Sequence, residues 1–349
     1  MTHHWQQDFH EYVKVFFHQN FFRSQVIRFI RICNHSIKLC FASERHKNKY
    51  FPALKHLEID KVEDAFCIYI FDLASLNMGR SLINFYQEFI MKPSFPSKRT
   101  ATNGPFCFDE LIYYLNDEYQ FSLWVVNDLD AVEFGALANP FRLFFYDWLA
   151  RKNIQVTHVA AVADNNSAVL LTGGSGVGKS TTTVSCLLGG LHFLGDDQCI
   201  LKYENEPMVY ALYNTFKIDK QLFNNAYFSA LKGKEEGYTL KENIEKAIFH
   251  SNKIASFNLA TAKPVKAILK LNSKKSIHPR IVASTAKDLN SHLIFNTMRQ
   301  TVGVSKHLAE YVTKNIQEFI RFIPCYQMDL SSNYQKNVSL IAEFLKSKI

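Results

Sequence analysis

The residues with the clearest chemistry form one glycine-rich segment, Gly173 to Ser180. Its sequence, Gly-Gly-Ser-Gly-Val-Gly-Lys-Ser, fits the pattern G-x-x-x-x-G-K-(S/T) at every fixed position. Glycines let backbone N–H groups curl around a phosphate, the lysine reaches the β- and γ-oxygens, and the hydroxyl can ligate Mg²⁺. The segment predicts binding of Mg²⁺-ATP through Gly173, Gly174, Ser175, Gly176, Val177, Gly178, Lys179, Ser180 and the adjoining Thr181.

Two adjacent acids, Asp196 and Asp197, follow Lys179 after one expected helix and one expected strand. Acids at the carboxyl end of such a strand face the crevice where α/β sheets bind ligands. One carboxylate can hold Mg²⁺ together with Ser180, and the other can accept the proton of an attacking hydroxyl. Which acid has which role is open, and a solvated Gly-Asp-Asp turn is the alternative interpretation.

His158 lies in an apolar run ahead of the glycine segment. It is either a catalytic group or a packed, hydrogen-bonded histidine of a strand. Lys217, Arg280 and Arg299 are candidates for additional phosphate contacts, with solvated surface charges as the alternative. We therefore predict Asp196, Asp197, Lys179 and His158 as the catalytic set.

These residues require a strand–loop–helix framework. We expect strands over Val156–Val162 and Ala168–Thr172, and the second strand leads directly into the glycine segment. A helix is expected over Ser180–Leu188, ending at two glycines, and a further strand over Leu191–Leu194. This order is the core of a phosphate-binding α/β unit.

The first part of the chain is predicted to be a smaller α+β domain that could recognise the substrate. Strands are expected over Ser36–Ala42, Phe66–Phe71 and Tyr119–Asn127, with a helical turn over Phe51–Leu57 and a loop over Pro93–Gly104. A packed helix is expected over Val13–Ile32, with a helix on a membrane surface as the alternative. Asn139-Pro140 then opens a helix over Phe141–Leu149. We predict two domains, residues 1–138 and residues 139–349.

The composition of the chain indicates which kinds of partner it binds and in which compartment it occurs. Of the 349 residues 47% are hydrophobic and 21% charged, and the net charge is +8. The lysines are scattered with no arginine stripe, so a nucleic-acid partner is not expected. Seven cysteines without a C-x-x-C pair predict reduced thiols, with no disulfide and no zinc site. No signal peptide and no apolar run of about 20 residues occurs, which predicts a cytoplasmic protein without an integral membrane segment.

The run Thr157–Val162, the glycine segment and Leu194–Asp197 together resemble the catalytic domain of HPr kinase/phosphorylase and its bacterial relatives. That family shares a P-loop fold with ATP-dependent phosphoenolpyruvate carboxykinase. The resemblance extends over residues 139–349 and is closest to a branch that carries its own amino-terminal domain. It rests also on the segments Asn139–Arg142, Asp147–Leu149, Leu212–Lys217 and Pro324–Met328.

The resemblance implies an α/β, P-loop serine kinase that uses ATP and Mg²⁺. It implies that His158 lies near the γ-phosphate, that the Asp pair supplies base and metal contacts, and that the chain can form homo-oligomers. Thr181 stands where HPr kinases carry an acidic residue, and the segment that binds HPr is not found. HPr is therefore not the expected substrate.

The predicted function is an ATP-dependent kinase that transfers the γ-phosphate to a hydroxyl, with Ser or Thr of a peptide or protein as acceptor. A kinase of a small-molecule hydroxyl, such as a sugar or nucleoside, is the first alternative. The second is an ATPase or nucleotide-gated binding module without a phosphoacceptor.

Overall fold

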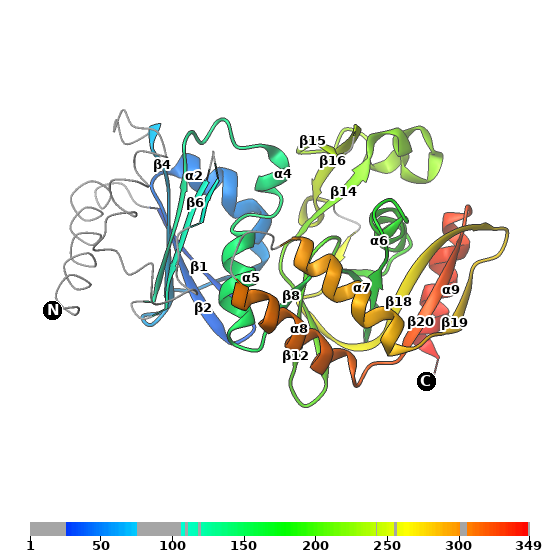
Figure 1. The fold of residues 1–349 in the computed structure, drawn as a ribbon. Coiled ribbons are helices and arrows are strands. Elements are labelled where there is room, and N and C mark those ends of the chain that lie inside the picture. Colours follow the sequence, from blue (N-terminus) through cyan, green and yellow to red (C-terminus); the bar gives the residue numbers. More distant parts are fainter. Residues whose placement is uncertain are drawn as a thin grey trace. The chain divides into compact units, whose positions relative to one another are not determined.

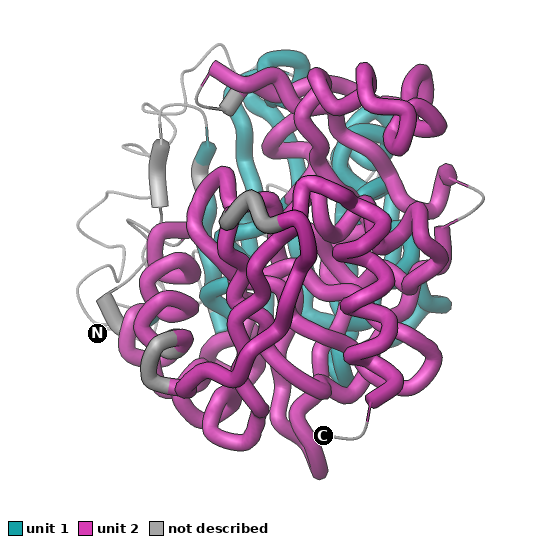
Figure 2. The backbone as a smooth tube through the Cα atoms, turned by 90° about the vertical axis from the view of Figure 1, so that its right-hand side faces the viewer, with its two compact units in different colours: residues 1–133, 140–148, 303–308 teal, residues 134–139, 149–302, 309–349 magenta. Residues whose placement is uncertain are grey.

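The computed structural model describes residues 26–74, 106–108, 111–117, 120–241, 243–254, 257–300 and 306–347 of the chain (Figure 1). They form a mixed α/β structure with several sheets. The chain divides into two compact units, residues 1–133, 140–148 and 303–308 in the first and residues 134–139, 149–302 and 309–349 in the second (Figure 2). The predicted division after residue 138 differs from this one, because residues 140–148 belong to the first unit.

The first unit contains a seven-stranded sheet in the order β3-β1-β2-β4-β7-β6-β5. Strands β2, β4 and β7 run parallel, and the other pairs are antiparallel. The strands are β1 Val26–Ile32, β2 His35–Phe41, β3 Glu58–Ile59, β4 Phe66–Asp72, β5 Phe106–Phe108, β6 Leu111–Asn116 and β7 Phe121–Val126. Helix α2 (Glu44–Tyr50) and a 3₁₀ helix (Phe51–Leu57) follow β2. The three predicted strands and the helical turn of this part are confirmed.

The helix predicted over Val13–Ile32 is wrong for its described part, because Val26–Ile32 is strand β1. Ile30 and Ile32 are buried and Arg31 between them is exposed, the alternation with period two that a strand on a core produces. The rest of that segment, and the loop predicted over Pro93–Gly104, lie outside the described residues.

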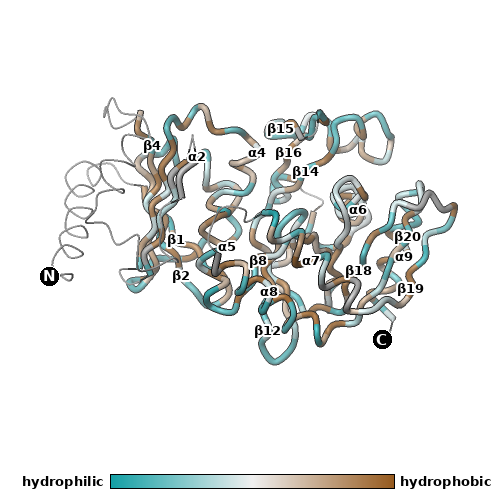
Figure 3. Tube along the Cα trace, viewed as in Figure 1, coloured by the Kyte–Doolittle hydropathy of each residue, from teal (hydrophilic) through white to brown (hydrophobic). Residues whose placement is uncertain are grey.

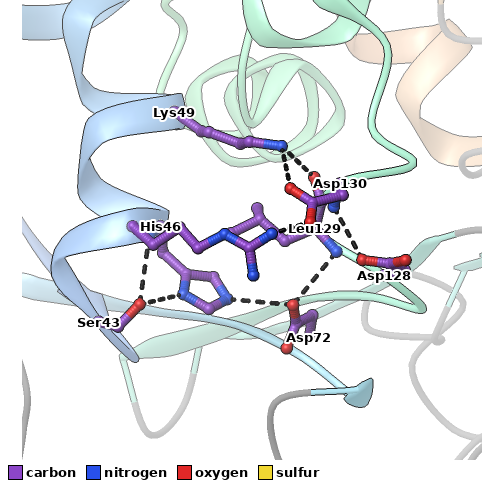
Figure 4. Close-up of polar contacts among 8 residues, drawn as sticks. Ser43, His46, Lys49, Asp72, Asp128, Leu129 and Asp130 are labelled. Atoms are coloured by element: carbon purple, nitrogen blue, oxygen red, sulfur yellow. Dashed lines mark hydrogen bonds and ion pairs between the residues drawn. The ribbon is translucent and has the colours of Figure 1, made fainter.

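A polar cluster lies where the parallel strands of this sheet end (Figure 4). Ser43 caps α2, and its Oγ lies 2.9 Å from Nδ1 of His46. His46 is buried, and its Nε2 lies 3.8 Å from Oδ2 of Asp72, which accepts a hydrogen bond from the amide of Leu129. The cluster therefore joins the ends of β2 and β4 to the chain that follows β7.

The second unit is built on a ten-stranded sheet in the order β17-β11-β9-β10-β18-β13-β12-β8, with β20 paired to β18 and β19 paired to β20. Its strands are β8 Gln155–Thr157, β9 Ala160–Ala163, β10 Ala168–Thr172, β11 His192–Gly195, β12 Cys199–Tyr203, β13 Pro207–Ala211, β17 Asn258–Leu259, β18 Ala262–Ser276, β19 Arg280–Ala283 and β20 Cys325–Ser331. A separate three-stranded sheet has the order β14-β16-β15, with β14 Thr215–Asp219, β15 Gly237–Lys241 and β16 Ile244–His250.

The helices after α2 are α4 Phe134–Leu137, α5 Arg142–Ala150, α6 Lys179–Leu188, α7 Ala286–Arg299, α8 Lys306–Ile320 and α9 Tyr334–Lys346. Short 3₁₀ helices cover Lys220–Asn224, Ala226–Leu231 and Ser251–Lys253. Helices α6 and α9 pack on the central sheet through Val184, Leu187, Val338 and Ile341, which belong to one buried apolar cluster. Figure 3 shows hydrophobic and hydrophilic stretches alternating along the helices and strands. The burial of this cluster fixes α6 against the strand that precedes it.

The strand predicted over Val156–Val162 is wrong, because that run forms two strands with different neighbours. β8 pairs with β12, whereas β9 lies between β10 and β11. The break falls at His158, whose backbone N–H donates to Oγ1 of Thr297 on α7 rather than to a neighbouring strand. His158 therefore stands in a break between strands, not inside one.

Among the helices of the described part of the chain, none has the length and apolar character needed to span a membrane.

Candidate active site

The glycine segment connects β10 to α6 by a turn that side chains would obstruct. A Cβ at Gly173 would lie 2.6 Å from Cγ1 of Val177, so any other residue would force Val177 or the loop to shift. Gly178, the residue that caps α6, has φ +105°, a conformation that L-residues with side chains rarely adopt. Glycines at these two positions therefore permit the tight entry into the helix.

Lys179 and Ser180 occupy the first turn of α6, next to the loop. The first N–H groups of a helix have no intrahelical acceptor and carry the positive end of its dipole, so this end favours an anion. Nζ of Lys179 donates to the carbonyl oxygen of Gly173 at 3.0 Å, which folds the ammonium group back over the loop. A cation and helix amides thus converge on an exposed loop at Gly174 to Gly176.

Asp196 follows β11, a strand that runs in the direction of β10 because both are antiparallel to β9. Its side chain is buried, and Oδ2 accepts a hydrogen bond from the backbone N–H of Lys217 on β14 at 2.9 Å. Oδ1 has no hydrogen-bond partner among the described residues. Burial and the charge of Asp197 raise the pKa of Asp196 to about 6, opposed by the Lys217 amide and the nearby Ser180 hydroxyl.

Asp197 is the more accessible acid, with a side chain 34% exposed. Its Oδ1 lies 3.3 Å from Nδ1 of His158, whose side chain is 11% exposed. Because Thr297 holds the backbone of His158, the imidazole is fixed where it can orient this carboxylate. The break between β8 and β9 and the end of β11 therefore bring His158 and Asp197 together.

The residues present fit Mg²⁺ bound together with phosphate oxygens. No group of three or more His, Cys, Asp or Glu that could hold a metal ion occurs among the described residues. Mg²⁺ that is shared with phosphates keeps several waters and needs only one or two carboxylates from the protein. The Ser180 hydroxyl and the unpartnered Oδ1 of Asp196 supply this kind of donor set.

The three downstream cations have different environments. Lys217 contributes its backbone amide to Asp196, and its Nζ lies 3.5 Å from the carbonyl oxygen of Gly135. Arg280 pairs with Asp329. The guanidinium of Arg299 lies over the ring of Phe295, 5.9 Å from its centroid.

Helix α7 supplies site residues that the sequence did not reveal. Thr297 holds His158, and His292 reaches the carbonyl of Gly173, an interaction that raises its pKa against the larger, lowering effect of burial. Nδ2 of Asn296 lies 2.9 Å from Nε2 of His292. His292 and Asn296 are four residues apart and lie on one face of the helix, a spacing that could have indicated a polar pair, whereas Thr297 lies on a different face.

Comparisons with known proteins give little further information. No family model matches the chain, and no curated protein matches it. Among solved structures, the HPr(Ser) kinase/phosphatase from Coxiella burnetii matches the chain with a TM-score of 0.29 and 15% sequence identity, over 55% of this chain and 93% of that chain. A TM-score this low carries no functional conclusion, so function is inferred from the residues of the site.

Proposed function

We propose that the chain is a phosphotransferase that uses Mg²⁺-ATP to phosphorylate a hydroxyl, with Ser or Thr of a peptide or protein as the acceptor. The observation that carries the proposal is that the glycine loop after β10 and the carboxylate of Asp196 after β11 lie at the same edge of the sheet. An anion-binding loop with Lys179 and Ser180 lies beside a buried carboxylate, Asp196, that has one oxygen unpartnered. Such a pairing suits a metal-bound triphosphate better than a free anion.

In this proposal the loop amides and Lys179 hold the phosphates in position for in-line attack. Ser180 and Asp196 hold Mg²⁺, which neutralises the charge that develops on the phosphate oxygens when it is bound. Asp197, the more exposed acid, accepts the proton of the attacking hydroxyl, and His158 orients it from 3.3 Å. The acceptor approaches from the side of Asp197 because Asp196 is buried.

A peptide or protein acceptor follows from the resemblance of residues 139–349 to serine kinases. The cytoplasm, the predicted compartment, provides the nucleotide. A small-molecule kinase and an ATPase use the same phosphate site, so an acceptor has to be identified by experiment.

The test is transfer of ³²P from γ-labelled ATP, with Mg²⁺, into a library of Ser- and Thr-containing peptides and into host lysate. Lys179→Ala should lose transfer, and Lys232→Ala, a change of the same kind at an exposed lysine, should retain it. Label on a peptide or protein that depends on Lys179 supports the proposal. Phosphate released at the same rate with or without acceptor would favour the ATPase, and failure to bind ATP would contradict all three functions.

A further inference from the structure

A second polar cluster borders the loop on the side opposite the aspartates. The strand order β11-β9-β10-β18-β20-β19 places the loop, which follows β10, in the middle. Asp196 and Asp197 follow β11 on one side. On the other side β18 and β20 run parallel to β10, so their carboxyl ends lie at the same edge as the loop.

The cluster consists of Asn272, Arg280 and Asp329, one from each strand on this side. Asn272 and Asp329 are paired in register, as are Arg280 and Asp329. Nδ2 of Asn272 donates to Oδ1 of Asp329 at 3.1 Å, and Nε of Arg280 donates to Oδ2 at 2.8 Å. Asp329 is buried, with its side chain 7% exposed, whereas the side chain of Arg280 is 65% exposed.

Residues adjacent in sequence to Asn272 and Asp329 lie against the phosphate-binding loop. The carbonyl oxygen of Leu271, adjacent to Asn272, lies 3.2 Å from where a Cβ of Gly173 would be. Cδ1 of Leu330, adjacent to Asp329, lies 3.3 Å from the corresponding position at Gly178. Asn272 and Asp329 therefore adjoin residues that border the loop, and Arg280 is paired with Asp329.

We propose that Arg280, held by Asp329 and Asn272, binds the nucleoside half of the triphosphate. The inference rests on the proposed function, since it presumes that the loop holds the phosphates. When the γ-phosphate points toward the aspartates after β11, the α-phosphate and nucleoside leave the loop toward β18 and β20. Among the described side chains on that side, Arg280 is charged and exposed.

Because Arg280 is paired with Asp329, it is better suited to bind the nucleoside than a phosphate group of the ligand. Asp329 compensates the charge of Arg280 through Nε, so the local field on an anion is weakened. A guanidinium still offers a flat face for stacking on a base and terminal N–H donors for ribose or base oxygens and nitrogens. With both carboxylate oxygens bonded, Asp329 fixes the plane of this group.

The experiment compares the binding of ATP and of inorganic tripolyphosphate, both with Mg²⁺, to the wild-type chain and to Arg280→Gln. Tripolyphosphate carries the three phosphates without the nucleoside. Arg280→Gln should weaken ATP binding by about tenfold or more, the size expected for a charge-assisted contact, and leave tripolyphosphate binding unchanged. Arg321→Gln, at an exposed arginine before the amino end of β20 and so at the opposite edge of the sheet, should change neither.

Arg280→Lys is the second variant, because it keeps a cation beside the buried Asp329 and so protects folding. It should also lose ATP affinity, since lysine lacks the planar fork. Equal losses for ATP and tripolyphosphate would overturn the inference and make Arg280 a phosphate contact. Unchanged ATP binding in both variants would show that Arg280 and Asp329 form only a surface ion pair without a role in ATP binding. A wild-type chain that binds neither ligand would contradict the proposed function itself.

Discussion

At the scale of single residues, the two adjacent aspartates differ in environment more than in sequence. Asp196 is buried, is held by the Lys217 amide and has a raised pKa, whereas Asp197 is one-third exposed beside His158. A buried acid with one unpartnered oxygen is a costly arrangement without a ligand. The environments therefore favour Asp196 as the metal ligand and Asp197 as the base.

Replacing each acid by its amide should separate these roles. Asp197→Asn should lower turnover by about a hundredfold or more, the size of a lost general base, with ATP affinity nearly unchanged. Asp196→Asn should also lower turnover and should in addition raise the Mg²⁺ concentration required for half-maximal activity. Turnover titrated against Mg²⁺ in each variant measures both effects.

Asp164→Asn provides the matched control, because that aspartate only accepts turn hydrogen bonds from the amides of Asn166 and Ser167. An asparagine can accept the same bonds. Normal turnover in both Asp196→Asn and Asp197→Asn would show that the carboxylates take no part in the chemistry.

At the scale of elements, the sequence predicted the strand, loop and helix around Lys179 because several signals agreed there. An apolar run of strand length, a fixed glycine pattern and a helix ending at paired glycines all pointed to one arrangement. The break at His158 could not be predicted, since β8 and β9 are short, are separated only by His158 and Val159, and have no glycine or proline between them. The contribution of α7 depends on tertiary contacts between residues more than 100 positions apart.

The loop that joins β10 to α6 should tolerate a methyl group at one glycine and not at another. Gly178→Ala places a Cβ at φ +105° and 3.3 Å from Leu330, so the free energy of unfolding should fall by about 1–2 kcal/mol. Gly174→Ala, where nothing lies within 4 Å and φ is not in the left-handed region, should leave it unchanged. Chemical denaturation of both variants measures the difference, and equal stabilities would mean that the loop does not require glycine at 178.

At the scale of the whole molecule, the two compact units interleave along the sequence, which a single boundary could not represent. Residues 140–148 join the first unit through aromatic contacts. Phe141 lies 5.4 Å from Trp124, Phe144 lies 5.3 Å from Phe66, and Trp148 lies 5.5 Å from His35, measured between ring centroids. The sequence showed an apolar helix here but not which sheet it would cover.

Stability of the first unit should depend on pH through His46. Burial lowers the pKa of His46 below its ordinary value, an effect that the positive charges of Arg45 and Lys49 reinforce and the negative charge of Asp72 opposes. Figure 4 shows Lys49 and Asp72 near His46. A group whose pKa is lowered by folding contributes stability above its unfolded pKa of about 6.5 and loses it as the pH falls through the folded pKa. We therefore expect the free energy of unfolding to decrease on acidification below pH 6.5, by about 1.4 kcal/mol for each pH unit between the two pKa values.

Replacing His46 isolates this contribution, because other buried histidines titrate equally in both proteins. In His46→Gln the side chain cannot be protonated but can still accept or donate a hydrogen bond near Ser43, so the decrease below pH 6.5 should be smaller than in the wild type. His278→Gln, at an exposed histidine, should retain the wild-type dependence. Urea denaturation followed by tryptophan fluorescence reports on the correct unit, since Trp124 and Trp148, the tryptophans of the described residues, both belong to it. Identical pH profiles for His46→Gln and the wild type would show that His46 is not what couples the unfolding of this unit to protonation.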